Sequence, residues 1–231
     1  MRIEPAPTFD FQDKIILPVA YFGSVYYFSL LARYSSIFLE DSESYLRQTL
    51  RNRTEILSAN GQQNLVIPVE RGRSSAQPIK EVRIAYHTPW QKNHWRTLVS
   101  AYQNSPYFEH YETDVQVFFH RKFNFLFDLN IEITQLMLSL FQISHSIQYT
   151  EKFEYPYGSP GDLRYTSWPI REKAPFDIDY RTVHYTQVFE EKYKFISHLS
   201  ILDLLFCEGP QGLRMLTAGK VVKSALNDIS Q

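Results

Sequence analysis

The chain has 231 residues, of which 44% are hydrophobic and 21% charged, a composition typical of a soluble globular protein with one sizeable core. Its formal net charge of −1 argues against nucleic acid as the partner, because proteins that bind nucleic acid are usually basic. A single cysteine, Cys207, excludes an intrachain disulfide and indicates a reducing compartment, so we expect a cytoplasmic protein.

The N-terminal residues favour a buried start to the fold over a signal peptide or a membrane span. Residues 1–14 read as a polar tail, and no apolar segment follows a basic start as it would in a signal peptide. The stretch 15–32 is uncharged, but Pro18, Gly23 and several polar side chains suit a spanning helix poorly. We therefore expect a buried strand followed by a buried helix, and no membrane span.

The pattern of the first forty residues predicts a βαβ unit. A short apolar run at 15–20 reads as a strand, residues 24–34 as a helix, and residues 36–41 as a second strand that ends in Glu40-Asp41. A right-handed crossover places the carboxyl ends of both strands at one edge of a parallel sheet. Ligands of open α/β sheets bind at that edge, so we expect a site there.

A β-hairpin follows. Residues 53–57 and 63–67 flank Asn60-Gly61, a pair that tolerates positive φ at both turn positions. After a polar loop at 71–78, the partly alternating pattern of 79–85 predicts another strand.

The next segment is helical. Pro89 opens a helix whose buried stripe we expect to consist of Trp95, Leu98, Val99 and Tyr102, at helical spacing. A longer helical region from about 114 to 143 is expected to be interrupted once.

The C-terminal third combines a loop with capped helices. Residues 155–175 are rich in Tyr, Pro and Gly and read as a long irregular loop, a kind of segment that often binds or covers a ligand. Ser200 and Asp203 have the spacing of a capping box, and Gly209-Pro210 ends that helix before a terminal helix begins at Gly212. Together these elements predict an α/β fold: an N-terminal βαβ unit with a hairpin extension and helices following, in a single compact domain over 1–231.

Charge is unevenly distributed along the chain. Residues 47–96 contain seven Arg and two Lys against three Glu, a net charge of +6, so the remainder carries −7. This asymmetry indicates a segment that faces an anion, or else a surface neutralised by acids from elsewhere in the fold. Arg47, Arg51 and Arg53, with Asn52 between the last two, are candidates to bind phosphate or carboxylate, which a planar guanidinium recognises well. A structural ion pair is the alternative for Arg51 and Arg53.

His94 is the candidate catalytic residue. If Trp95 faces the core, His94 lies at the margin of the same helix, where a ring is both held and partly wet and can act as a general base. Trp90, Tyr107 and Tyr111 are candidates to hold the ligand beside it. The seven histidines lack the spacing of metal sites, and the common phosphate-binding, zinc-protease and serine-hydrolase motifs are missing from the sequence.

Several motifs, in order, resemble the WbqC-like family over about residues 17–212. They are Tyr45 with Arg51-Asn52-Arg53, the hairpin ending in Ile67-Pro68-Val69, Trp90-x-x-x-His94-Trp95, Tyr102-x-x-Ser105-Pro106-Tyr107-Phe108, and Leu199-Ser200-Ile201-Leu202-Asp203-Leu204-Leu205-Phe206-x-x-Gly209-Pro210. The family is associated with lipopolysaccharide and O-antigen gene clusters, so the resemblance implies a role in bacterial surface-polysaccharide synthesis. Many members begin with His-Gln-Pro-Asn-Tyr, whereas the comparable stretch here is Leu17-Pro18-Val19-Ala20-Tyr21.

Three functional hypotheses follow. In the first, the chain is a transferase acting on a nucleotide- or carrier-linked sugar, with the arginines on phosphate and His94 as general base. In the second, it is a non-catalytic protein that binds the same kind of anionic small molecule, such as a nucleotide sugar. The third, nucleic-acid binding, fits the arginine-rich stretch and its aromatic neighbours but not the net charge.

Overall fold

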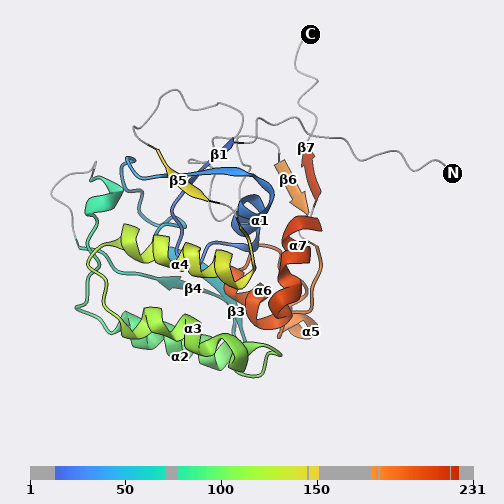
Figure 1. The fold of residues 1–231 in the computed structure, drawn as a ribbon. Helices are drawn as coiled ribbons and strands as arrows, with labels where there is room; N and C mark the ends of the chain where they lie inside the picture. The colour runs from blue at the N-terminus through green and yellow to red at the C-terminus, as the bar shows by residue number, and fades with distance from the viewer. Residues whose placement is uncertain are drawn as a thin grey trace, which may run out of the picture.

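A small parallel sheet with helices packed beneath it organises the molecule (Figure 1). The computed structural model describes residues 14–70, 77–144, 146–150, 178–181, 183–218 and 220–223. The predicted loop at 155–175 and nearly all of the predicted tail at 1–14 lie outside these ranges.

The predicted βαβ unit is confirmed. β1 (Lys14–Pro18) pairs in parallel with β2 (Ser36–Glu40), in a register that places Pro18 opposite Glu40. Between them runs α1 (Val25–Arg33), and the side chain of its N-cap residue Ser24 accepts a hydrogen bond from the Tyr27 amide. The apolar run of β1 is typical of a parallel strand covered on both faces.

A third strand extends this sheet. β5 (Ile147–Tyr149) pairs in parallel with the other side of β2, giving the order β1-β2-β5. This strand was not predicted, because three residues are too few to show a period. Its direction means that all three carboxyl ends share one edge.

The predicted hairpin is present as β3 (Arg53–Ser58) and β4 (Gly61–Val66), with a turn different from the one expected. Ser58 pairs with Gly61, so Ala59 and Asn60 form the turn. Gly61 has φ +97°, whereas Asn60 keeps a negative φ. Only the glycine is therefore needed for its backbone conformation.

The strand predicted at 79–85 is wrong. Residues Ile79–Glu81 form the 3₁₀ helix η1, followed by isolated bridges from Arg83 to Phe125 and from Ile84 to Val69. Ile79 and Val82 are both buried, and their spacing of three suits a 3₁₀ turn rather than a strand.

Three helices lie below the parallel sheet in the view of Figure 1: α4 (Leu126–Leu140) above the hairpin strands, and α2 (Trp90–Tyr102) and α3 (Phe108–His120) below them. The expected interruption is confirmed, although α3 begins at Phe108 rather than near 114. Figure 1 shows α2 and α3 side by side, with α4 between them and the sheet.

The C-terminal part packs against one end of this assembly (Figure 1). It contains the antiparallel strands β6 (Ile178–Arg181) and β7 (Lys220–Lys223), the short helix α5 (Glu190–Tyr193), α6 (Ile201–Glu208), the 3₁₀ helix η2 (Gly209–Gln211) and α7 (Gly212–Ala218), which lies against α1. The predicted helix end at Gly209-Pro210 and the helix from Gly212 are confirmed.

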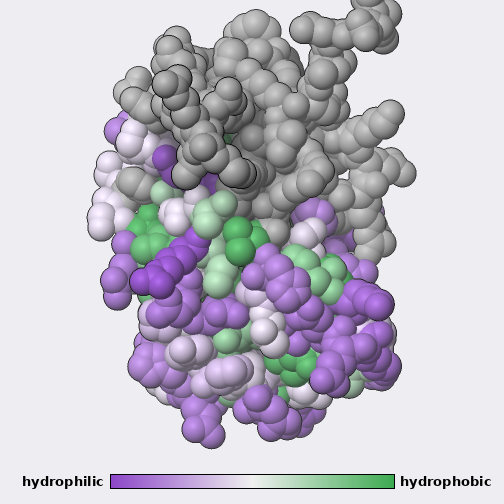
Figure 2. Space-filling model, turned by 90° about the vertical axis from the view of Figure 1, so that its right-hand side faces the viewer, coloured by the Kyte–Doolittle hydropathy of each residue, from purple (hydrophilic) through white to green (hydrophobic). Residues whose placement is uncertain are grey.

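One apolar core joins these elements, which together form the mixed α/β fold that the sequence predicts. Among the described residues, the exposed large hydrophobic side chains lie apart from one another: Leu46 in the segment after β2, Val66 on β4, Val117 on α3 and Tyr149 on β5. On the face shown in Figure 2, hydrophilic residues surround small hydrophobic patches wherever the structure is described. None of the helices in the described ranges is long and apolar enough to cross a membrane.

Candidate functional site

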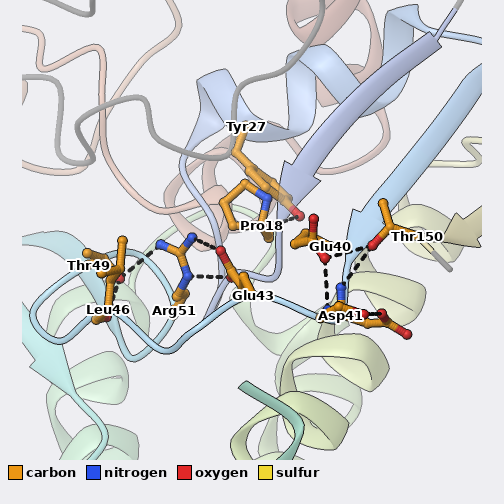
Figure 3. A network of polar contacts seen from close by, with 10 residues as sticks. Pro18, Tyr27, Glu40, Asp41, Glu43, Leu46, Thr49, Arg51 and Thr150 are labelled. Atoms are coloured by element: carbon orange, nitrogen blue, oxygen red, sulfur yellow. Dashed lines mark hydrogen bonds and ion pairs between the residues drawn. The ribbon is translucent and has the colours of Figure 1, made fainter. Parts of the chain in front are cut away.

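The carboxyl edge of the parallel sheet gathers polar side chains from the ends of its strands, as the βαβ pattern predicts (Figure 3). Thr150, directly after β5, donates its hydroxyl to Oε1 of Glu40 at the end of β2, over 2.8 Å. The Ser42 amide donates to the same oxygen, also over 2.8 Å. Asp41 forms an ion pair with Lys80. These contacts fix the course of the chain as it leaves β2.

Arg51 and Glu43 form a buried ion pair at this edge (Figure 3). Arg51 Nε donates to Glu43 Oε1 over 2.6 Å and Nη2 donates to Oε2, while the two side chains are only 2% and 0% exposed. The structural ion pair, one of the two alternatives left open for Arg51, is therefore present. Glu43 neutralises part of the positive charge of residues 47–96, as the Asp41–Lys80 pair also does.

The residues beside Arg51 differ in accessibility. The Asn52 side chain donates from Nδ2 to the Ile67 carbonyl over 3.1 Å, and Arg53 Nη2 donates to the Gln48 carbonyl. Within the described part of the chain, Asn52 Oδ1 and Arg53 Nε have no hydrogen-bond partner. Arg47 is exposed to solvent. Arg47 is thus the most accessible of the three arginines, and its role in binding stays a prediction.

The buried face of α2 is rotated from the one expected. Its buried residues are Trp90, His94, Leu98, Ala101 and Tyr102, whereas Trp95 and Val99 are half-buried. Trp95 packs against Phe108 and Phe119 of α3, with ring centroids 6.0 and 5.6 Å away. Because α3 covers Trp95 from the side, His94 turns inward and is only 7% exposed. The expectation that His94 lies at the margin of the helix is wrong.

His94 is held among aromatic rings. Its Nδ1 lies 3.0 Å from the Tyr21 hydroxyl, and its ring centroid is 5.2 Å from that of Trp90 in an edge-to-face arrangement. Burial lowers the pKa of His94 from 6.5 to about 4, against a smaller opposing effect from a backbone hydrogen bond with Val66. His94 is therefore neutral at pH 7, the protonation state that a general base requires.

The loop after β1 that carries Tyr21 is strained and firmly held. Phe22 has φ +41°, which is rare for a bulky residue and is maintained only where the surroundings impose it. Its carbonyl accepts hydrogen bonds from the hydroxyls of Thr54 (2.7 Å) and Ser200 (3.0 Å). Leu17, the second-last residue of β1, is fully buried in the core.

The structure brings some of the predicted site residues together and separates others. Trp90 and His94 lie in the first two turns of α2, whereas Tyr107 and Tyr111 lie at the start of α3, beside the other end of α2. Tyr102 follows His94 by eight helical steps, a rise of about 12 Å. Tyr107 is half-buried there, and its amide donates to the Phe206 carbonyl.

Asp203 has a polar environment that the sequence analysis did not predict. Its carboxylate accepts hydrogen bonds from the hydroxyls of Tyr102 (2.9 Å) and Tyr185 (2.7 Å), and burial raises its pKa to about 6. Ser200 caps α6 as expected, by accepting from the Leu202 amide. The Ser200 amide, however, donates to the Glu55 carbonyl, so Asp203 does not complete a capping box.

Metal ligands do not cluster in the described ranges: no three His, Cys, Asp or Glu side chains there are arranged to hold a metal ion. Cys207 is buried next to Asp203.

Comparisons with known proteins identify one family and one relative. The model of the WbqC-like protein family matches residues 20–162. The uncharacterized protein Rv1507c of Mycobacterium tuberculosis (strain ATCC 25618 / H37Rv) is 26% identical over 212 residues, which cover 81% of this chain and 91% of that protein. No solved structure matches the chain.

Proposed function

Since the chain belongs to the WbqC-like protein family, we propose that it is a bacterial, cytoplasmic transferase of lipopolysaccharide, O-antigen or other surface-polysaccharide synthesis. Its substrate in this proposal is a nucleotide- or carrier-linked sugar. Family membership supports the place in surface-polysaccharide synthesis, and the transfer reaction is what we propose.

The observation that carries the catalytic part is the state of His94. A neutral imidazole, held between Tyr21 and Trp90 beside the loop that leaves the sheet edge, suits a base that removes a proton from the attacking group. Its low pKa keeps the ring unprotonated throughout the physiological pH range, although a base with a pKa of about 4 is weaker than one with a pKa near 7.

Binding of the anionic part of the substrate is assigned to the segment after β2. Arg47 is exposed and can donate to a phosphate, whereas Arg53 is half-buried and its Nε, which has no protein partner in the described ranges, is enclosed. Arg51, neutralised by Glu43, shapes this segment together with Asn52. Tyr107 and Tyr111 join the same site only for a substrate long enough to span the α2–α3 pair.

A non-catalytic binding protein is the second candidate, and a specific observation favours it. Leu17 is a core residue at the place where the resemblance to WbqC-like sequences leads us to expect histidine, and His94 is largely enclosed. The chain would then bind the same nucleotide-linked sugar without converting it.

Turnover by the wild type separates the two candidates, and His94→Gln then tests His94 as the base. Calorimetry against a panel of nucleotide sugars first identifies a ligand, and turnover is then measured with the ligand that binds. For a general base, turnover should fall by about 10²–10⁴ while affinity stays within a few-fold.

His87→Gln is the matched control, because His87 is exposed just before α2 and should change neither quantity. Turnover unchanged in His94→Gln would exclude His94 as the base, whereas binding of a nucleotide sugar by the wild type with no turnover would favour the binding protein. Absence of binding by the wild type to every nucleotide sugar would remove the substrate from the proposal.

A further inference from the structure

The loop 46–49, which lies between β2 and β3, contains a strained residue. Gln48 has φ +58°, in the left-handed region that residues with a Cβ rarely adopt. Its carbonyl accepts a hydrogen bond from Arg53 Nη2. Since a strained backbone persists only where surrounding contacts impose it, we infer that Arg53 holds Gln48 in this conformation.

Arg53 is a half-buried cation whose charge lacks an acidic partner. Within the described part of the chain it forms no ion pair, in contrast to Arg51, which is neutralised by Glu43. The Gln48 carbonyl is a neutral acceptor, whereas a phosphate oxygen carries the opposite charge and bonds a guanidinium more strongly. A phosphate group can therefore replace this carbonyl as the acceptor of Arg53.

Polar atoms without partners are concentrated beside the loop. The described ranges contain six buried side-chain nitrogen or oxygen atoms without a hydrogen-bond partner, and three of them are the Tyr45 hydroxyl, Asn52 Oδ1 and Arg53 Nε. Buried polar atoms in native proteins nearly always have partners, and each one without costs free energy. The observed conformation of residues 45–53 is therefore held less firmly than that of a fully paired segment.

The loop can move without disturbing the core. Residues 46–48 are exposed, and the Thr49 hydroxyl donates back to the Leu46 carbonyl over 2.8 Å, which closes the loop on itself (Figure 3). The chain on either side is anchored, because the Tyr45 amide donates to the Gln77 carbonyl and the Leu50 carbonyl accepts from the Tyr21 amide. Movement is thus confined to the exposed loop.

We propose that the contact between Arg53 and the Gln48 carbonyl is an autoinhibitory latch. A phosphate group takes Arg53 Nη2, and Gln48 returns to a negative φ as the loop 46–49 opens. Arg53 then joins exposed Arg47 in binding the anion. Assignment of this phosphate to a nucleotide-linked sugar rests on the proposed function, whereas the latch requires only a phosphate group.

The experiment is calorimetry of the full chain with inorganic pyrophosphate. If only the open loop binds, the apparent affinity is the intrinsic affinity reduced by the fraction of open molecules. Gln48→Gly should weaken binding by about 3–10-fold, because glycine adopts a positive φ without strain and the closed loop is stabilised. Gln48→Val should tighten binding by a similar factor, because a β-branched residue tolerates a positive φ least. Both variants remove the glutamine side chain, so opposite changes cannot come from a lost contact between that side chain and the ligand.

Gln142→Gly and Gln142→Val are the matched controls. Gln142, directly after the C-cap residue of α4, is also an exposed glutamine and has φ +56°. The same substitutions there should shift the melting temperature in the same two directions as at Gln48. The affinity for pyrophosphate should stay unchanged, because Gln142 is outside the latch.

Absence of pyrophosphate binding by the wild type would overturn the latch, and so would equal affinities of the wild type and the Gln48 variants, or a loss of affinity in both variants. If Gln48→Val does not fold, Gln48→Asn takes its place. Asparagine adopts a positive φ more readily than glutamine and keeps the carboxamide, so this variant should weaken binding, and an affinity equal to that of the wild type would contradict the latch.

Failure of the proposed function has a different signature. If the Gln48 variants behave as expected towards pyrophosphate while the wild type transfers no sugar, the latch stands and the transferase does not. If the wild type turns over a nucleotide sugar that binds Gln48→Gly equally well, the latch alone is refuted.

Discussion

At the scale of single residues, the side chains with the largest consequences are buried polar groups whose partners come from distant positions. Arg51 and Glu43 illustrate this, because each charge is kept out of water and compensated by the other. Such a pair adds little stability compared with apolar residues, but removal of one partner leaves an uncompensated buried charge.

We therefore expect Arg51→Met to lower the free energy of unfolding by about 3–5 kcal/mol, because Glu43 would remain buried without its partner. The double variant Arg51→Met/Glu43→Leu should recover most of this loss. Urea unfolding followed by circular dichroism measures both. Arg47→Met is the control, and its effect should stay within about 0.5 kcal/mol because Arg47 is exposed. Equal losses for Arg51→Met and Arg47→Met would contradict this reading of the pair.

At the scale of elements, the junctions between helices depend on close contact between a glycine backbone and a neighbouring side chain as much as on capping. Gly209 ends α6 with φ +52°, and a Cβ there would lie 2.6 Å from the Tyr107 ring. Gly61 also has a positive φ, but its nearest neighbour would be 3.8 Å from a Cβ. A side chain would thus cause backbone strain at both positions, but a steric clash at Gly209 alone.

Gly209→Ala should lower stability by more than Gly61→Ala does. Alanine at a positive φ destabilises by about 1 kcal/mol or more at either position, and at Gly209 the Tyr107 ring must also move. Thermal unfolding of both variants provides the comparison. A loss of stability in Gly209→Ala equal to or smaller than that in Gly61→Ala would show that the Tyr107 ring moves aside at no cost.

At the scale of the whole molecule, Asp203 connects three parts of the chain. It lies on α6, Tyr102 lies on α2, and Tyr185 belongs to the segment that precedes α5. Gln187 donates to the Tyr185 hydroxyl, and Cys207 is the other titratable group near the carboxylate. The protonation state of one carboxyl therefore affects the packing of the C-terminal part on the rest.

Stability should depend on this carboxyl between about pH 4 and pH 6. The pKa of Asp203 is about 6 in the folded state, against an ordinary value of 3.8, so the folded protein binds the proton more tightly. The resulting stabilisation is fully present below about pH 4 and is lost as the pH rises through 6, by about 2–3 kcal/mol. Asp203→Asn should remove this dependence.

Melting temperatures of the wild type and Asp203→Asn, measured from pH 4 to pH 7, give the contribution as a difference. The difference between the two proteins is needed because His94 changes stability in the opposite direction. Its pKa is lowered from 6.5 to about 4, so its contribution to the free energy of unfolding is lost as the pH falls from 6.5 to 4. Parallel curves for the two proteins would contradict the shifted pKa of Asp203.

The sequence by itself determined the elements whose pattern is local. The βαβ unit, the hairpin, the cap of α6 at Ser200 and the helix end at Gly209 were predicted correctly, because periodicity, turns and caps depend on residues close in the chain. The charge asymmetry of residues 47–96 also followed from the sequence, but the pairing of Arg51 with Glu43 did not.

Only the tertiary structure decided how those elements face one another. The rotation of α2 that buries His94 follows from the packing of Trp95 against α3, and the partners of Arg51, Asp203 and β5 come from other parts of the chain. Helical spacing restricts which residues share a face, but contacts with neighbouring elements select the face that is buried. For that reason, the sequence identified His94 as a candidate, while its enclosure, its protonation state and its contact with Tyr21 required the fold.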